Sequence, residues 1–364
     1  MIKKYKNIEV ISKLKEKKFT VKPTGDKFAN EFHKDLLGEH EVKGQFLVRL
    51  KNCFLLTQWS IPITREGWIL IETSGKLGIL VGNILRSNDF IFFPEIKFIL
   101  YVLLIRISFI FKFNIFRNFF SYSSLFHMVP RHGFKPLEPA ISHWVFENLP
   151  QLKMFFKAIS EDENCKLFVG ENLYDWQELT LNLMRLKKDQ ILKIKKKYLG
   201  QVRNLYLSRL PYVSSNDFIF QPKDRNWVSK TIRNTLEKKY NLKNTSRQKI
   251  AISRKFCGRR KLVADFKVSE LLKKEGYKII FPEKLFEIDK ILQCYQADTI
   301  LGLPSGSAIT NIIFSNKGKL VDILGKDKKS YISVWFLVSR ELGMEYSLFL
   351  AKDVKINSDY RNND

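Results

Sequence analysis

Three arginines follow a short apolar segment in the second half of the chain: Arg254, Arg259 and Arg260. The guanidinium group is a planar fork of donors that matches the oxygens of a diphosphate. The apolar run at 249–253 is typical of a strand, so the arginines are expected at its carboxyl end. The arrangement predicts a diphosphate-binding loop, and a solvated basic loop is the other interpretation of such a charge run.

A second apolar segment, 299–301, leads into a turn of small residues that precedes a helical pattern: Ser305, Gly306 and Ser307. Small side chains allow backbone N–H groups to approach an anion, and the start of a helix adds a favourable dipole. The turn lacks the Gly-Lys-Ser/Thr sequence of a Walker A loop. Phosphate binding and an ordinary strand-to-helix turn are therefore both open.

A histidine and a glutamate, His143 and Glu147, lie four residues apart near the start of a predicted helix that is N-capped by Ser142. Residues at this spacing share one face of a helix. A histidine there can take a proton from a hydroxyl or bind it, although a lone histidine is more often a structural hydrogen-bonding group. The chain has no GxSxG, HExxH or GxGxxG pattern and no Asp-x-Asp after an apolar strand.

Apolar strands alternate with amphipathic helices along most of the chain. Two early strands are predicted at 46–56 and 68–72, and a regular series follows at 249–253, 277–281, 299–301 and 319–323. This alternation predicts an α/β protein whose second half is a doubly wound parallel sheet with ligands at the carboxyl ends of its strands.

The 364 residues suffice for two domains, and a polar, proline-containing passage at 211–223 is the predicted linker. We assign 1–215 to an N-terminal domain, 216–350 to a C-terminal Rossmann-like domain, and 351–364 to a polar tail. The first domain contains the strands at 46–72, an aromatic and basic stretch at 96–120, and an α/β part at 140–210.

The formal net charge is +26, from 63 basic and 37 acidic residues. Such an excess is typical of proteins with anionic partners, but Lys spread along the chain is also typical of an ordinary solvated surface. The stretch 96–120 interleaves bases with Phe and Ile and is too short in its apolar part to span a bilayer. It is predicted either to contact an anionic membrane surface peripherally or to be a buried helix.

Four widely spaced cysteines and the absence of an apolar signal region at the start predict a cytoplasmic protein, with the inner face of the membrane as its site of peripheral contact.

These motifs together resemble glycosyltransferase family 61 over roughly 46–325. His143-Trp144 and Leu149-Pro150 are similar to the helix of the family's first domain, and Ile252-Ser253-Arg254 with Arg260 is similar to its strand-end arginines. The run from 297 to 314 parallels the family's passage to an Asn, here Asn311. The family's His-Gly-Ala turn is replaced by Ser305-Gly306-Ser307, which puts any role of that histidine in doubt.

The resemblance implies a GT-B-like fold, with two Rossmann-like domains facing a central cleft. The N-terminal domain, 1–215, is then expected on the acceptor side, and the C-terminal domain, 216–350, is expected to bind the nucleotide sugar. The resemblance also implies an inverting hexosyl- or pentosyltransferase of polysaccharide biosynthesis. The donor is expected to be a nucleotide-diphosphate sugar, UDP-linked, and the acceptor a hydroxyl of a glycan or glycoconjugate. His143 is expected to be the base, with Glu147 orienting it or binding acceptor. The diphosphate is expected to be held by Arg254, Arg259, Arg260, Ser305, Gly306, Ser307 and Asn311. We expect no metal, no obligatory cofactor and no nucleic-acid partner.

Two alternatives remain at this point. One is a non-catalytic basic α/β protein that binds an anionic polymer, nucleic acid or a membrane surface. The other is a degenerate family member that acts as a membrane-bound scaffold, which the serine at position 305 keeps open.

Overall fold

The chain forms two compact units, each combining helices with a sheet that contains parallel strands, so the predicted α/β class is confirmed. The computed structural model describes residues 8–13, 17–42, 46–56, 61–64, 121–128, 141–169, 173–193, 199–208, 222–242, 248–256, 265–303, 307–315, 318–325 and 329–351. The predicted strand at 68–72 and the stretch 96–120 lie outside these residues. Within them, no helix is long and apolar enough to cross a membrane.

Unit 1 comprises Met1–Glu16, Lys43–Tyr174 and Leu186–Tyr212, and unit 2 comprises Lys17–Val42, Asp175–Arg185 and Val213–Asp364. The chain therefore passes into unit 2 twice before residue 213. The predicted domain boundary at 215 and the GT-B arrangement stay predictions.

Unit 1 is built on a mixed sheet with the strand order β1-β4-β9-β6-β7-β8 and with β5 paired to β4. Its strands are β1 (Ile8–Lys13), β4 (Phe46–Leu56), β5 (Ile61–Ile63), β6 (Ser121–His127), β7 (Lys166–Phe168), β8 (Ile191–Leu192) and β9 (Leu199–Ser208). Pairing is antiparallel from β1 to β9 and parallel from β9 to β8. Alternate apolar residues such as Val48 and Leu50 form the buried cluster on one face, because successive side chains of a strand point to opposite faces.

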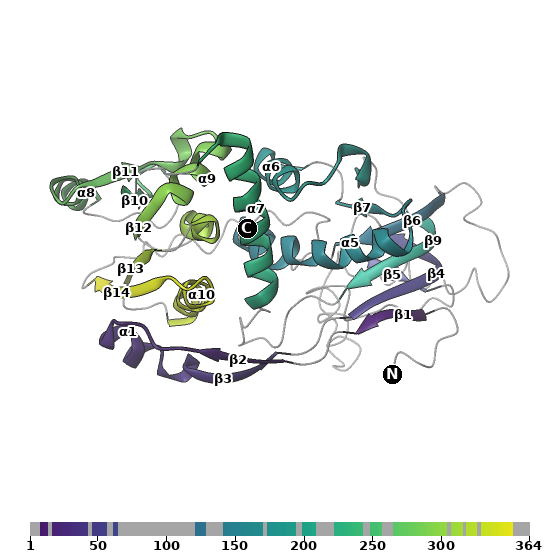
Figure 1. Cartoon of the computed structure of the whole chain (residues 1–364), viewed down its shortest axis with the longest axis horizontal. Helices are drawn as coiled ribbons and strands as arrows, with labels where there is room; N and C mark the ends of the chain where they lie inside the picture. Colours follow the sequence, from purple (N-terminus) through teal and green to yellow (C-terminus); the bar gives the residue numbers. More distant parts are fainter. Residues whose placement is uncertain are drawn as a thin grey trace, which may run out of the picture. The chain divides into compact units, whose positions relative to one another are not determined.

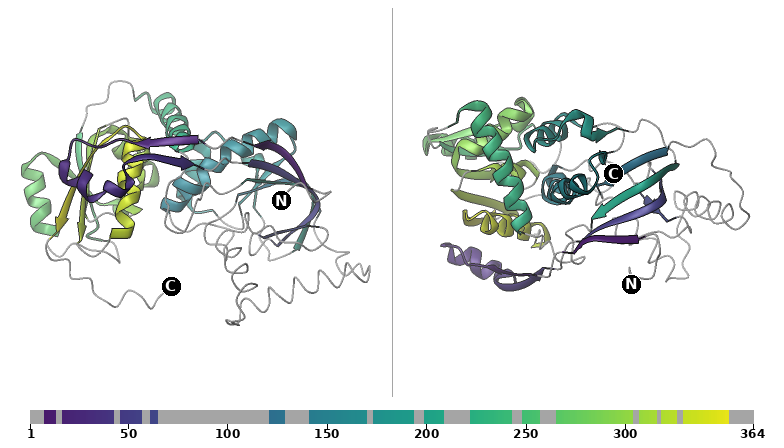
Figure 2. Two further views of the ribbon diagram at one scale, coloured as in Figure 1. Left: turned by 90° about the horizontal axis from the view of Figure 1, so that it is seen from below. Right: turned by 45° about the vertical axis from the view of Figure 1, so that its right-hand side comes forward.

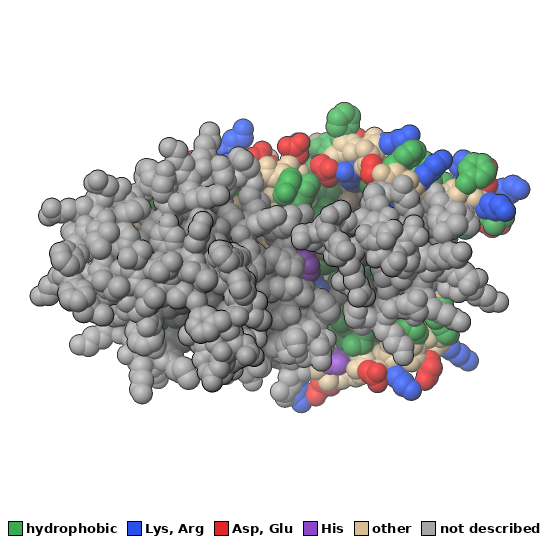
Figure 3. All heavy atoms as spheres, turned by 180° about the vertical axis from the view of Figure 1, so that it is seen from behind, with side chains coloured by type: hydrophobic (Ala, Val, Ile, Leu, Met, Phe, Trp, Pro, Cys, Tyr) green, Lys and Arg blue, Asp and Glu red, His purple; other side chains and the backbone are tan. Residues whose placement is uncertain are grey.

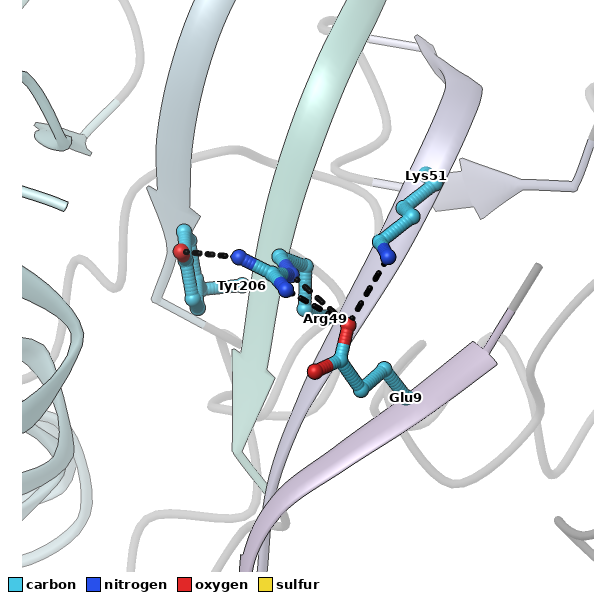
Figure 4. Close-up of polar contacts among 4 residues, drawn as sticks. All are labelled: Glu9, Arg49, Lys51 and Tyr206. Atoms are coloured by element: carbon cyan, nitrogen blue, oxygen red, sulfur yellow. Dashed lines mark hydrogen bonds and ion pairs between the residues drawn. The ribbon is translucent and has the colours of Figure 1, made fainter. Parts of the chain in front are cut away.

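A charged cluster joins three strands of this sheet (Figure 4). Arg49 of β4 pairs in register with Glu9 of β1 and with Tyr206 of β9. Its Nη2 donates to Glu9 Oε2 at 2.5 Å, its Nη1 donates to the Tyr206 hydroxyl at 3.4 Å, and Lys51 Nζ lies 3.0 Å from the same Glu9 oxygen. The hydrogen bond from Arg49 is the main reason that the pKa of Glu9 is lowered. The cluster thus fixes the register of the edge strand β1.

Unit 2 is built on a parallel sheet with the order β11-β10-β12-β13-β14 (Figure 1). Its strands are β10 (Gln248–Ser253), β11 (Tyr277–Ile280), β12 (Ala297–Leu303), β13 (Lys319–Gly325) and β14 (Glu345–Ala351). The second strand in sequence lies on one side of β10 and the third on the other, so the sheet is doubly wound with its switch point between β10 and β12. The doubly wound prediction is confirmed, and β14 extends the sheet beyond the last predicted strand.

Helices cover both faces of this sheet (Figure 1). On one face α8 (Asp265–Lys274) packs against the cluster formed by Ala251, Leu301 and Val321. On the other lie α9 (Glu287–Gln296) and α10 (Lys329–Glu341), with α7 (Pro222–Tyr240), α6 (Asp175–Leu183) and the 3₁₀ helix Ser307–Phe314.

A buried ion pair joins α7 to α10. Arg225 and Glu341 form this pair, and each side chain is only 1% exposed. Burial raises the pKa of Glu341 to about 7, against the opposing effect of the Arg225 charge. Neither the sequence position nor the spacing of these residues indicated the contact.

Residues 17–42, which we call the arm, pack against β14 and α10 (Figure 2). The arm consists of the hairpin β2 (Lys17–Val21) and β3 (Gly38–Val42) with α1 (Lys27–Phe32) between them. The Thr24 hydroxyl donates to the Tyr346 carbonyl at 2.8 Å, and Asp26 Oδ2 accepts from Leu348 N at 3.1 Å. These bonds satisfy backbone groups on the outer edge of β14, which would otherwise be open to pairing with another chain.

His33 is the buried aromatic contact of the arm. Its ring is 3% exposed and stacks on Phe336 of α10, with 4.4 Å between ring centroids. Burial lowers the pKa of His33 from 6.5 to about 4, because a charged ring would lose its hydration.

The lowered pKa of His33 predicts that acid reduces the free energy of unfolding. Between pH 6.5 and pH 4 the unfolded chain takes up a proton at His33 and the folded chain does not. The free energy of unfolding is therefore not reduced by His33 above pH 6.5. It falls as the pH is lowered from 6.5 to 4, by at most about 3 kcal/mol. His33→Phe keeps the stacked ring without the titrating group. Urea unfolding of both proteins at pH 7, 5.5 and 4 should show a smaller acid loss in the variant, and equal losses would contradict the assignment.

Candidate functional site

His143 and Glu147 are in direct contact in unit 1. His143 ends α4 (Ile141–His143), which begins one residue before Ser142. Ser142 therefore lies inside the helix, and its prediction as the N-cap is wrong. Its Nδ1 lies 2.7 Å from Glu147 Oε1, with the imidazole side chain 24% exposed and the carboxylate 2% exposed. A carboxylate accepts and cannot donate, so Nδ1 carries the proton and Nε2 is the basic nitrogen of the neutral ring. The pair therefore has the contact that a histidine base with an orienting carboxylate requires.

The helix that carries this pair is irregular. After α4 the chain makes a π-helical turn at Trp144–Asn148 and a 3₁₀ turn at Leu149–Gln151 before α5 (Leu152–Glu161). π turns are uncommon and often occur at functional sites. Pro150 lacks a backbone N–H, which suits a position where the regular hydrogen-bond ladder is interrupted. The whole π turn is buried, and α5 continues with Phe155 packed against Phe126 of β6 at 5.6 Å.

Gln151 links the π turn to the sheet of unit 1. It is 1% exposed, its Nε2 donates to the Glu147 carbonyl at 3.1 Å, and its Oε1 accepts from the Ser208 hydroxyl at 3.4 Å. The sequence analysis missed this residue, because a single glutamine after a proline carries no pattern that indicates its partner.

Arg254 lies at the carboxyl edge of the sheet in unit 2. It directly follows β10 and is 7% exposed, and Ser253 Oγ accepts from the Lys255 N–H at 3.1 Å in the turn. Ser253 pairs in register with Leu303, the last residue of β12. Arg254 therefore lies beside the end of β12 at the switch point of the sheet, the place where doubly wound sheets bind ligands.

The remaining predicted diphosphate residues are only partly described. Arg259, Arg260, Ser305 and Gly306 lie outside the described residues. Ser307 begins the eight-residue 3₁₀ helix Ser307–Phe314, and Asn311 in it is 8% exposed. Arg254 follows β10, and Ser307 begins the helix that comes after β12, the neighbour of β10 in the sheet of unit 2. His143 and Glu147 belong to unit 1.

Among the described residues, no group of three or more His, Cys, Asp or Glu side chains is placed to hold a metal ion. Cys53, Cys165 and Cys294 are buried, and burial raises their thiol pKa values, to about 12 for Cys165 and for Cys294. These three thiols are therefore unsuited to nucleophilic chemistry, which requires the thiolate.

Comparison with known proteins gives one family. The family described as Glycosyltransferase 61 has a sequence model that matches residues 141–321. The matched span starts at the first residue of α4 and ends within β13, so it contains every predicted site residue. No curated protein matches the chain.

The contacts of Gln151 predict a stability effect. Gln151→Ala leaves the Glu147 carbonyl and the Ser208 hydroxyl without these buried bonds, which is expected to cost about 1–3 kcal/mol. Gln293→Ala is the matched control, since Gln293 also takes part in two hydrogen bonds, both accepted by its Oε1 at a partly exposed position. Urea unfolding should show a larger loss in the free energy of unfolding for Gln151→Ala than for Gln293→Ala. Equal losses would contradict the stabilising role of the buried Gln151 hydrogen bonds.

Proposed function

The chain belongs to glycosyltransferase family 61 through residues 141–321, and from this premise we propose that it is an inverting enzyme that uses a nucleoside-diphosphate sugar. The family makes it a glycosyltransferase, with a sugar donor and a glycan acceptor. The inverting mechanism, a UDP-linked donor and a GT-B arrangement are part of the proposal. The observation that carries it is the 2.7 Å contact between His143 Nδ1 and the buried Glu147 carboxylate.

The proposed reaction is a single displacement. His143 Nε2 takes the proton of the acceptor hydroxyl while the hydroxyl oxygen forms a bond to the anomeric carbon. The bond between that carbon and the diphosphate oxygen breaks, its electron pair leaves with the diphosphate, and the configuration inverts. The Glu147 carboxylate stabilises the imidazolium that forms, in the way a carboxylate supports the histidine of other acid–base sites.

The leaving diphosphate gains negative charge as the bond breaks, and donors placed in advance lower the barrier. We assign this role to Arg254, with Arg259 or Arg260, Asn311 and the Ser305–Ser307 backbone as further donors. Support comes from the position of Arg254 at the switch point beside the end of β12. In this proposal the protein groups suffice without an obligatory metal ion.

The alternative of a non-catalytic polyanion-binding protein lacks a supporting observation. Figure 3 shows Lys and Arg side chains interspersed with Asp and Glu on the drawn face of the described residues. Mixed signs at this spacing are typical of a solvated surface rather than of a nucleic-acid footprint.

The base assignment predicts a specific loss in turnover. His143→Ala should lower kcat by about 10²–10⁴-fold with nucleoside-diphosphate affinity nearly unchanged, since the base acts on the acceptor. His143→Gln keeps a donor toward Glu147 and should fold like wild type yet remain equally slow. His40→Ala, at a partly buried histidine that bonds the Leu36 carbonyl, is the control and should keep full turnover. A lower Tm with unchanged kcat in His143→Ala would make this histidine structural.

The leaving-group assignment predicts a shared loss of binding and turnover. Arg254→Ala should weaken UDP binding and lower turnover, because each charge-assisted contact is worth about 1.5–3 kcal/mol. Arg254→Lys should retain more UDP affinity and turnover than Arg254→Ala but less than wild type, since a point charge does not replace the planar guanidinium fork. Arg203→Ala, at an exposed arginine of unit 1, is the control.

The same assignment predicts that activity survives EDTA. Activity that chelation abolishes and Mn²⁺ restores would contradict it, as would wild-type UDP affinity in Arg254→Ala.

A further inference from the structure

An exposed aromatic ring lies two residues after Arg254. Phe256 is 45% exposed in the turn that follows β10. Its ring packs against Phe281, which follows β11, with 5.3 Å between centroids and 69° between ring planes. Because β10 and β11 are parallel neighbours, both rings lie at the carboxyl edge of the sheet, the edge that also carries Arg254.

Cations surround this exposed ring. Lys284 Nζ, from the 3₁₀ turn Pro282–Lys284, lies 4.1 Å from the Phe256 centroid and 5.9 Å from the Phe281 centroid. Lys255 Nζ lies 5.7 Å from the Phe256 centroid. The cation–π contacts and the Phe281 ring hold Phe256 in place, while 45% of the residue stays exposed. An exposed aromatic ring with two lysine ammonium groups against it matches a ligand that is both planar and anionic.

We propose that Phe256 is the stacking platform for the base of the donor nucleotide, with Lys255 and Lys284 placed near its polar groups. This inference rests on the proposed function, which places the diphosphate at Arg254. Two residues span at most ~7 Å, so a ligand whose phosphates contact Arg254 has its ribose and base within reach of Phe256. The face of an aromatic ring stacks any base, so Phe256 contributes affinity for the nucleoside and leaves the choice of base to other groups.

The chain offers a matched control on the same unit. Tyr240 is 37% exposed and has Lys239 Nζ 5.5 Å from its ring centroid. It ends α7 ahead of the amino end of β10, so it lies on the side of the strand away from Arg254. Tyr240 thus resembles Phe256 in being exposed and in having one lysine at about the distance of Lys255. It differs in its place relative to the sheet.

The test is calorimetric titration of the full chain with UDP, with GDP and with inorganic pyrophosphate. Phe256→Ala should weaken the binding of whichever nucleoside diphosphate the wild type binds by about 5–100-fold, the usual worth of one stacked base. Its pyrophosphate affinity should be unchanged, and Phe256→Trp should restore nucleotide affinity. Tyr240→Ala should bind all three ligands like wild type.

Four outcomes would overturn the proposal that Phe256 stacks on the base. Unchanged nucleotide affinity in Phe256→Ala would contradict the base subsite alone and leave the proposed donor site at Arg254 intact. An equal loss of nucleotide and pyrophosphate affinity would make Phe256 a structural support of the Arg254 turn. A wild type that binds pyrophosphate and neither nucleotide would contradict a nucleotide donor, and one that binds none of the three would contradict the donor site as a whole.

Discussion

The proposed donor site at Arg254 depends on the parallel pairing of β10 with β12. This pairing sets Ser253 opposite Leu303 and makes the two strand ends neighbours at the point where the strand order reverses. The chain after β10 goes to α8 on one face of the sheet, and the chain after β12 goes to a 3₁₀ helix among α7 and α9. Arg254 directly follows β10 at this point. The proposed anion site rests on this strand order and on the position of Arg254.

The proposed acceptor site depends on a different constraint: the buried carboxylate of Glu147 needs hydrogen-bond donors. Removing an ionised carboxylate from water is costly unless hydrogen bonds compensate it, and His143 Nδ1 provides one such bond at 2.7 Å. The π turn permits the contact, and Gln151 connects the carbonyl of the same glutamate to the end of β9. The orientation of the imidazole is thus linked to the sheet of unit 1 through two neighbouring residues.

The sequence predicted local features well and tertiary ones poorly. Strand β4 has the predicted bounds of 46–56, and β10 differs by one residue, because runs of β-branched and large apolar residues identify strands directly. The spacing of His143 and Glu147 predicted their contact. The arm, β14 and the Arg225–Glu341 pair were missed, since each depends on partners that are distant in sequence. Ser307 begins a 3₁₀ helix, a distinction from an α-helix that apolar spacing over eight residues cannot make. The roles of the predicted site residues stay predictions.

The anomeric configuration of the sugar released from the donor, when water takes the place of the acceptor hydroxyl, tests the central claim most directly. The full chain is incubated with UDP- and GDP-sugars of defined anomeric configuration, and ¹H NMR follows the anomeric proton of the sugar as it first leaves the donor, before mutarotation. A single displacement assisted by His143 predicts release with inverted configuration, hence a β-anomer from an α-linked donor. Release with retained configuration would contradict the account, because it requires two displacements or attack from the face of the leaving diphosphate.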